Sequence, residues 1–339
     1  MPRSTVPDAR PTLADVAALA GVSPATASRV LNGTAKVSRS ARADVHDAVS
    51  RLAYVRQRAR AARDQRISSI AAVVCGTDQQ WLFADPYFSR ILLGAGRELR
   101  SDEIQLVLLV VRGATDHPLV ERYLARGAAD GVMLINAHDR DPLGLTLQAM
   151  NVPTVSAGRP TPPCRLPYVD ADNRSGAREA VRYLLRSGRK HVVSIAGPPD
   201  MAVGADRRDG YREAIAEAGA AGLVLYGDFT QASGEHAMLQ LLDHQPDLDA
   251  VFVASDLMAL GALRALRRAG RKVPDDVAVI GFDDAPLAAH TEPRLTTVRQ
   301  PVEDMGAAMA RHLTRHISGL ADVPAQTVFP TQLVVRDSA

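Results

Sequence analysis

The stretch "TLADVAALAGVSPATASRVLNG", residues 12–33, carries only two ionisable side chains, Asp15 and Arg29. Thr12 followed three residues later by Asp15 is a capping signal that typically begins a helix. The apolar residues that follow recur at the spacing of one helical face: Leu13, Val16, Ala17 and Ala20. Gly21 then predicts the carboxyl end of this first helix, because glycine adopts the left-handed backbone of a helix cap without strain.

A second, shorter helix is predicted directly after this glycine. Ser23 is a favourable N-cap and Pro24 a favourable first residue, so the helix should run from about Pro24 to Asn32 before Gly33 ends it. Its apolar residues are Ala27, Val30 and Leu31. Two short helices joined by a tight glycine turn predict a helix-turn-helix, although an ordinary helical hairpin has the same pattern.

A third helix should follow Ser38, its predicted N-cap, with an apolar stripe formed by Ala41, Val45, Ala48, Val49 and Leu52. The charge distribution favours the helix-turn-helix over the plain hairpin. Residues 1–66 hold 12 Arg and Lys against 5 Asp and Glu, a net charge of +7. The remaining 273 residues hold 28 against 33, a net charge of −5. This asymmetry indicates a polyanion, such as DNA, as the partner of the first segment only.

Residues 12–33, together with "KVSRSARADVHDAVSRLAYV" (36–55), resemble the headpiece of the lactose repressor/galactose repressor (LacI/GalR) family of bacterial transcription regulators. The resemblance implies a homodimer on double-stranded, pseudo-palindromic operator DNA, with the second helix in the major groove. Arg29 would then bind guanine through two hydrogen bonds, while Pro24 and Ala25 make apolar contacts, for example to a thymine methyl group. For Arg29 the alternatives are a phosphate contact or a solvated position. The phosphate contacts implied are Thr12, Ser23, Thr26, Ser28 and Asn32.

The segment "YVRQRARAAR", residues 54–63, combines good helix formers with dense positive charge and no apolar face. We expect such a segment to be disordered in water and to fold when DNA neutralises its charge. The family has a hinge helix here, which implies DNA contacts through Arg58, Arg60 and Arg63. Because Arg56 and Arg63 replace the usual proline and leucine, the hypothesis is arginine insertion into a narrow minor groove. A solvated basic linker is the alternative.

From residue 67 onward, β-rich runs alternate with helical patterns, which is typical of parallel sheets covered by helices on both faces. The strands are predicted at 70–74, 105–111, 131–135, 152–156, 192–197, 223–227, 250–255 and 277–282, with helices between them, for example at 175–188, 209–219 and 256–270. Residues 67–339 are too many for one such sheet, so two sheets are expected. The predicted fold class is therefore α/β: an all-α helix-turn-helix headpiece (1–56), a hinge segment (57–66) and a two-lobed core (67–339) with two parallel sheets.

The core resembles the periplasmic-binding-protein-like core of the same family. The resemblance implies an N-lobe of about residues 67–168 and 297–327, and a C-lobe of about residues 169–296 and 328–339. Open α/β sheets bind ligands at the carboxyl ends of their strands, so the effector is expected between the lobes. The sequence shows no leucine-heptad tail of the kind that makes some members tetrameric, so a dimer is expected.

The candidate effector contacts near strand ends are Tyr87, Phe88, Asn136, Arg207, Ser255 and Asp283. Two of them follow from the resemblance. "ADRRDGY" (205–211) matches the effector arginine motif of the family at Arg207, and "VIGFDD" (279–284) places Asp283 where the family holds ligand hydroxyls. A carboxylate, a guanidinium and aromatic rings together suit a pocket for a sugar or a nucleoside.

The remaining candidates have open alternatives. Tyr87 and Phe88 can stack on a sugar or a base, or they can simply pack in the core. Ser255 and its neighbour Asp256 stand where a strand meets a helix, so both can serve as helix caps alone.

Other classes of function have weaker support. "LLGAGRELR" (92–100) lacks the spacing of a nucleotide loop, and no metal-ligand cluster, nucleophile elbow or paired-carboxylate motif stands out, so no cofactor, no metal and no enzymatic activity are predicted. The alternatives left open are a binding protein that delivers ligand to a transporter and a cytosolic doubly wound enzyme.

Localisation and regulation follow from what the sequence lacks. Cys75 and Cys164 have no metal-ligand spacing and are expected to be reduced thiols. Residues 1–12 lack the apolar segment of a signal peptide, and no apolar run is long enough to span a membrane. We therefore expect a cytoplasmic, effector-responsive transcription regulator, a repressor that senses a sugar or sugar derivative and has no membrane partner.

Overall fold

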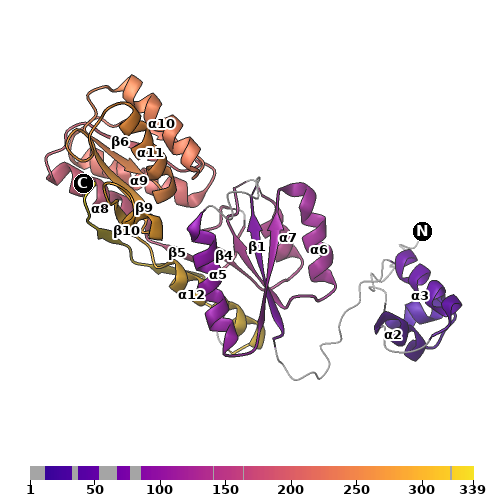
Figure 1. The fold of residues 1–339 in the computed structure, drawn as a ribbon. Helices are drawn as coiled ribbons and strands as arrows, with labels where there is room; N and C mark the ends of the chain where they lie inside the picture. Colours follow the sequence, from indigo (N-terminus) through magenta and orange to yellow (C-terminus); the bar gives the residue numbers. More distant parts are fainter. Residues whose placement is uncertain are drawn as a thin grey trace, which may run out of the picture. The chain divides into compact units, whose positions relative to one another are not determined.

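The computed structural model describes residues 12–32, 37–52, 67–76, 85–139, 141–162, 164–320 and 323–339. The chain forms two units, an amino-terminal helical headpiece and an α/β core (Figure 1).

The headpiece consists of α1 (Leu13–Leu19), α2 (Pro24–Asn32) and α3 (Arg39–Arg51). Thr12 and Asp15 cap α1 reciprocally: the Asp15 carboxylate accepts a hydrogen bond from the Thr12 backbone N–H at 2.7 Å, and the Thr12 hydroxyl accepts one from the Asp15 N–H at 3.3 Å. Gly21 turns the chain with φ of 63°. The three helices share a small apolar core formed by Val16, Ala17, Ala27, Val30, Val45 and Ala48. The predicted helix-turn-helix and third helix are therefore confirmed.

The first sheet of the core belongs to the N-lobe and is parallel throughout, in the order β11-β5-β4-β3-β1-β2. Its strands are β1 (Ser69–Cys75), β2 (Gln105–Val111), β3 (Gly131–Ile135), β4 (Thr154–Ala157), β5 (Tyr168–Ala171) and β11 (Gln326–Phe329). The central strands β1 and β3 are buried along their whole length, which explains why both read as continuous apolar runs in the sequence.

The second sheet belongs to the C-lobe, in the order β12-β10-β9-β8-β6-β7. Its strands are β6 (Val192–Ala196), β7 (Val224–Tyr226), β8 (Ala250–Val253), β9 (Ala278–Asp283), β10 (Thr296–Arg299) and β12 (Gln332–Val334). All neighbours pair in parallel except β12, which lies antiparallel to β10 at the edge. The two predicted parallel sheets are thus present, with one antiparallel edge strand.

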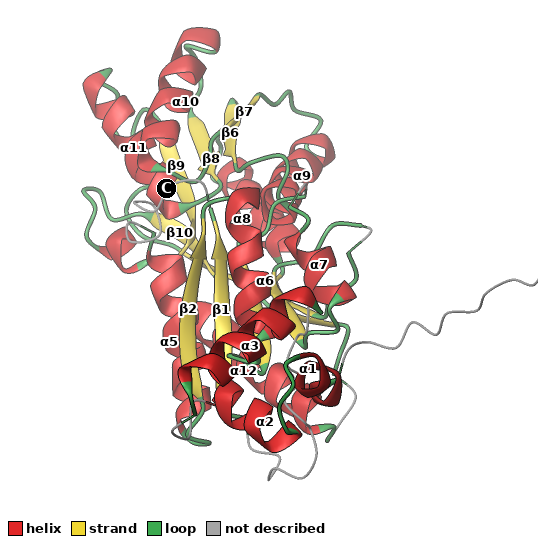
Figure 2. Ribbon diagram, turned by 90° about the vertical axis from the view of Figure 1, so that its right-hand side faces the viewer, coloured by secondary structure: helices red, strands yellow, loops and turns green. Residues whose placement is uncertain are grey.

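The helices cover the sheets as the alternation of strands and helices predicts (Figure 2). In the N-lobe, α5 and α12 pack on one face of the sheet. In the C-lobe, α10 and α11 cover one face, where Val251 and Val253 point, whereas α8 and α9 cover the other, where Ala250 and Phe252 point. The helix bounds are α5 (Pro86–Arg100), α6 (His117–Ala125), α7 (Leu143–Ala149), α8 (Asn173–Arg186), α9 (Ala202–Glu217), α10 (Gln231–His244), α11 (Asp256–Arg268) and α12 (Val302–Ser318), with short 3₁₀ helices at Ala114–Asp116 and Pro286–Ala289.

The chain crosses between the lobes three times, and each crossing lies two to three residues later than the boundary expected from the sequence. The expected boundaries after residues 168, 296 and 327 all fall inside strands: β5 and β11 belong to the N-lobe sheet, and β10 to the C-lobe sheet. Strands of four residues carry too little apolar pattern to show which sheet they join.

Candidate functional site

A cleft between the two lobes encloses a space of about 1130 Å³, part of it open to solvent. It lies at the carboxyl ends of the strands, where ligands bind in open α/β sheets. All six candidate effector residues line it: Tyr87, Phe88, Asn136, Arg207, Ser255 and Asp283. The structure therefore brings together residues that are separated by almost 200 positions, and their contact with an effector stays a prediction.

Arg207 lies on α9, which begins seven residues before the helix expected at 209–219. Its side chain is 4% exposed. The guanidinium donates hydrogen bonds to the Asn173 side chain (2.8 Å), the Ala254 carbonyl (2.6 Å) and the Asp283 carboxylate (3.2 Å). It also stacks on Phe282, 3.7 Å from the ring centre. These contacts hold the arginine rigidly in the wall of the cleft.

Asp283 ends β9 with φ of 117°, an unusual backbone for a residue other than glycine. Its Oδ1 accepts hydrogen bonds from Arg207 and, at 2.6 Å, from the Gln300 side chain. Burial raises the pKa of Asp283 to about 6; the nearby Asp85 acts in the same direction, while Arg207 opposes the shift. The strained backbone and the two donors fix a carboxylate that the surroundings only partly neutralise.

Tyr87 and Phe88 belong to the first turn of α5, capped by Asp85, whose Oδ1 accepts the Tyr87 N–H at 2.9 Å. The two rings meet edge to face, with centres 5.5 Å apart. Phe88 is buried in the N-lobe core as well as lining the cleft, so packing accounts for its position. Tyr87 is half-buried, and burial raises the pKa of its hydroxyl, which is therefore a neutral donor at physiological pH.

Ser255 and Asp256 divide their roles. Ser255 is the N-cap of α11, and its hydroxyl accepts the Met258 N–H at 3.2 Å. Asp256 is fully buried and accepts hydrogen bonds from the Thr297 hydroxyl (2.5 Å) and the Ala285 N–H (2.8 Å), so it braces the loop after β9 and does not line the cleft.

Asn136 follows β3 with φ of 61°, and its side-chain amide donates to the Cys75 carbonyl at 2.7 Å. This bond ties the ends of β3 and β1 together at the cleft. Asn136 thus has a structural role in addition to its place in the lining.

Most of the lining was not singled out from the sequence, including the polar residues Asp85, Arg159, Asp170 and Gln300. Their signal is positional: Asp170 is the third of the four residues of β5, and Arg159 follows β4 by two residues. Neither stands in a recognisable motif. Burial raises the pKa of both Asp85 and Asp170.

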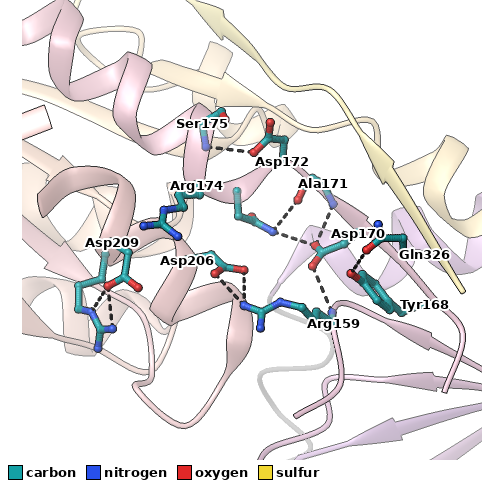
Figure 3. A network of polar contacts seen from close by, with 12 residues as sticks. Arg159, Tyr168, Asp170, Ala171, Asp172, Arg174, Ser175, Asp206, Asp209 and Gln326 are labelled. Carbon is teal, nitrogen blue, oxygen red and sulfur yellow. Dashed lines mark hydrogen bonds and ion pairs between the residues drawn. The ribbon is translucent and has the colours of Figure 1, made fainter. Parts of the chain in front are cut away.

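A polar network links the two lobes beside the cleft (Figure 3). Arg159 of the N-lobe donates to both carboxylate oxygens of Asp206 on α9, at 2.8 and 2.9 Å. Asp170 accepts hydrogen bonds from the Arg159 N–H (3.1 Å) and from Asn173 (2.8 Å), which in turn holds Arg207. At another point the His138 ring contacts Asp200 at 2.9 Å. Binding between the lobes therefore acts on an interface that is already closed by charged pairs.

The headpiece presents part of the predicted DNA-binding set on its surface. Pro24, Ala25 and Arg29 are exposed on α2, whereas Thr26 and Ser28 are half-buried. The hydroxyls of Thr12 and Ser23 accept backbone hydrogen bonds as helix caps. The Thr12 hydroxyl also donates to the Asp15 carboxylate at 2.7 Å, and the Ser23 hydroxyl lies 2.9 Å from that of Thr26, so a phosphate would have to replace these partners. Their contact with DNA stays a prediction. Asn32 ends α2, but its side chain lies outside the described part of the structure, as do Arg58, Arg60 and Arg63 altogether.

Two expected absences can be stated for the described residues only. Within them no group of three or more His, Cys, Asp or Glu side chains could hold a metal ion. No helix in that part of the chain is long and apolar enough to cross a membrane. Cys75 and Cys164 are free, and burial raises the pKa of both thiols, which disfavours the reactive thiolate form.

Comparisons with known proteins agree with this architecture. A family model described as "Bacterial regulatory proteins, lacI family" matches residues 12–57, and one described as "Periplasmic binding protein-like domain" matches residues 181–339. The chain is 46% identical over 334 residues to the HTH-type transcriptional regulator CelR of Thermobifida fusca, covering 97% of this chain and 98% of that protein. It is 32% identical to the HTH-type transcriptional repressor CytR of Escherichia coli K12, with 96% of each chain covered.

Solved structures give the same assignment. The transcriptional regulator CelR–cellobiose complex superposes with a TM-score of 0.77 at 46% identity, covering 97% of this chain and 100% of that one. The lac repressor dimer bound to operator and the anti-inducer ONPF superposes with a TM-score of 0.72 at 26% identity, covering 97% and 99%. The chain therefore belongs to the LacI family of bacterial regulatory proteins, helix-turn-helix regulators of transcription.

Proposed function

We propose that this protein is a cytoplasmic repressor that binds a pseudo-palindromic operator as a homodimer and responds to an oligosaccharide, with cellobiose as the first candidate. The observation that carries the proposal is the buried Arg207–Asp283 pair in a cleft that Asp85 and Tyr87 also line. The similarity to CelR, whose solved structure is a cellobiose complex, supports the choice of sugar.

The cleft offers what a sugar needs. Carboxylate oxygens of Asp283 and Asp85 can accept hydrogen bonds from hydroxyl groups, and the Arg207 guanidinium can donate to a hydroxyl or ring oxygen. Tyr87 and Phe229 provide aromatic surface for the C–H faces of the ring. A nucleoside has fewer hydroxyl groups to donate to these acceptors, so an oligosaccharide can form more hydrogen bonds in the cleft.

Effector and DNA are coupled through the arrangement of the two lobes. A ligand that contacts Arg207 and Asp283 on the C-lobe and Asp85 on the N-lobe stabilises one arrangement over another. In the dimer this arrangement sets the spacing of the two headpieces on the operator. Such coupling typically amounts to about 1–3 kcal/mol, or about 5–150-fold in operator affinity.

The test uses the purified full-length protein and two readouts. Cellobiose should raise the melting temperature, because a ligand at 100 times its Kd stabilises the folded form by about 2.7 kcal/mol. It should also lower the affinity for operator DNA in a fluorescence anisotropy titration. A transport binding protein would show the first effect without any DNA binding, and an enzyme would turn the sugar over.

Arg29→Ala should weaken binding to the specific operator by roughly 1–3 kcal/mol and relax the preference at one base pair in each half-site. The reason is the loss of a guanidinium that is exposed on α2 and can bind guanine through two hydrogen bonds. Competition binding with single-base operator variants measures both effects. An equal loss of affinity for every sequence would instead identify Arg29 as a phosphate contact.

Cellobiose affinity should fall as the pH is lowered through about 6, the pKa of Asp283 that burial sets. Ligand hydroxyls donate to the ionised carboxylate, so binding lowers its pKa and releases a proton. Below the pKa the affinity should therefore decrease by up to about tenfold per pH unit. The charged and titratable groups around Asp283 are Arg207, Asp85 and Arg90, together with the buried Asp256, which interacts electrostatically with Asp283. Calorimetry between pH 5 and 8 measures the slope, and a flat profile would contradict this role of Asp283.

A further inference from the structure

The charged side chains of the cleft are strongly unbalanced. Among the residues that the structure describes, five carboxylates line it, Asp85, Asp139, Asp141, Asp170 and Asp283, against the two guanidinium groups of Arg159 and Arg207. Leaving His138 out of the count, the formal excess among these side chains is three negative charges. Asp170 is buried, and Asp85 and Asp283 are half-buried, so salt screens the ionised carboxylates only weakly.

Both arginines of the cleft are already bound to carboxylates. Arg207 donates to Asp283, and Arg159 donates to both oxygens of Asp206. A carboxylate therefore already offsets the positive charge of each guanidinium, while the remaining N–H groups of both arginines can still donate to a ligand. His138 is engaged as well, through its contact with Asp200. Among the residues that the structure describes, the cleft therefore presents no cation without an anionic partner.

Asp85 occupies the place in the N-lobe where an anion would otherwise be favoured. A helix amino terminus carries a partial positive charge and free N–H groups, which attract phosphates. At α5 the carboxylate of Asp85 itself caps this terminus through the Tyr87 N–H. It also lies close enough to Asp283 to raise the pKa of that group. A phosphate bound here would be repelled by two carboxylates, Asp85 of the N-lobe and Asp283 of the C-lobe.

One feature of the cleft favours an anion. Met201, Ala202 and Val203 at the start of α9 line the cleft, and no side chain in the described part of the chain caps this helix. The partial charge at a helix amino terminus is only about +0.5 of an elementary charge. It is outweighed by the three excess carboxylates, so the net preference is against anions.

We propose that the cleft binds an uncharged oligosaccharide and rejects the same sugar once it is phosphorylated, and that Asp85 determines this specificity. The proposal rests on the proposed function, because it concerns the effector of the same cleft. A sugar phosphate carries about −1.5 to −2 charges at pH 7. Juxtaposed with like charges in a weakly screened cleft, it should bind at least about 100-fold more weakly than the neutral sugar.

The experiment compares each neutral sugar with its phosphate on the full-length protein by titration calorimetry at pH 7.5. The probes are cellobiose with cellobiose 6-phosphate and maltose with maltose 6-phosphate. Asp85→Asn removes the charge but keeps the cap, because asparagine is an equally good N-cap. In Asp85→Asn the affinity for the neutral sugar divided by the affinity for its phosphate should fall at least about tenfold, as expected when one charge is removed at short range.

Asp249→Asn is the matched control. Its carboxylate also accepts backbone N–H groups, from Lys190 and His191, but it precedes β8 at the end of the strands away from the cleft. The ratio should not change in this variant. Melting temperatures of both variants confirm that they are folded, and the comparison of sugars on the unmodified protein needs no variant.

The outcomes separate the two proposals. If cellobiose fails to bind but maltose does, the choice of cellobiose is wrong, and the maltose pair decides the specificity. A phosphorylated sugar that binds as tightly as its parent overturns the specificity proposal and leaves the proposed function intact. An unchanged ratio in Asp85→Asn shows that something other than the charge of Asp85 excludes the phosphate. Absence of binding by all four sugars overturns both proposals.

Discussion

Arg207→Ala should abolish the response to the effector while operator binding stays near normal. The substitution removes a buried guanidinium that holds Asp283, Asn173 and the Ala254 carbonyl together. Removing one partner of a buried pair costs about 3–5 kcal/mol, because the remaining charge is left without its partner. This cost falls on the stability of the fold. In effector binding, the loss of a hydrogen bond from a charged group costs about 1.5–3 kcal/mol, or about 10–100-fold in affinity. The headpiece does not contain Arg207, so the free protein should still bind its operator.

The measurement is an operator titration with and without cellobiose. Arg182→Ala is the control, because its pair with Glu217 is exposed and such pairs contribute about 0–1 kcal/mol. The double variant Arg207→Ala/Asp283→Asn removes both charges and should regain stability without regaining the effector response. If the response to cellobiose survived in Arg207→Ala, the assignment of the cleft would fail even though the family membership stands.

Gly94→Ala should destabilise the core markedly, although alanine is the better helix former. Helices α5 and α12 cross so closely that a Cβ atom at Gly94 would overlap the carbonyl oxygen of Glu303, and one at Gly306 would overlap that of Ile91. A backbone oxygen cannot rotate away, so the helices must separate. Overpacking of this kind costs typically 1–3 kcal/mol or more. At about 2–4 °C per kcal/mol for a domain of this size, the melting temperature should fall by roughly 2–12 °C.

Gly96→Ala, two residues further along α5, is the matched control. The nearest atom to a Cβ there is a methyl group of Leu106 at 4.0 Å, so the added carbon has room. This variant should be more stable than the unmodified protein by about 0.5–1 kcal/mol, because alanine loses less backbone entropy in a helix. Thermal denaturation of the two variants side by side measures the difference. Equal effects of both substitutions would show that the helix crossing tolerates a methyl group.

The family of the protein and the location of its cleft could be predicted from the sequence because both depend on short sequence motifs. The cap formed by Thr12 and Asp15, the turn at Gly21 and the restart at Ser23–Pro24 each depend on contacts within a few residues. The eight predicted strands are apolar runs, and all of them except β2 and β7 are buried along most of their length, as central parallel strands are. Arg207 and Asp283 were found because they stand in motifs that resemble those of the family.

The tertiary structure alone decided which distant side chains share an environment. Asp85 reads in the sequence as an ordinary residue before a proline, and Asp170 as the end of a short strand, yet both line the cleft with Asp283. The sequence also did not show to which sheet β5, β10 and β11 belong. Nor did it show that Gly94 contacts Glu303 or that Arg159 pairs with Asp206. Local order follows from caps, turns and apolar spacing within one segment. The charge balance of a cleft depends on burial and on contacts between segments up to 200 residues apart, and these exist only once the two sheets have formed.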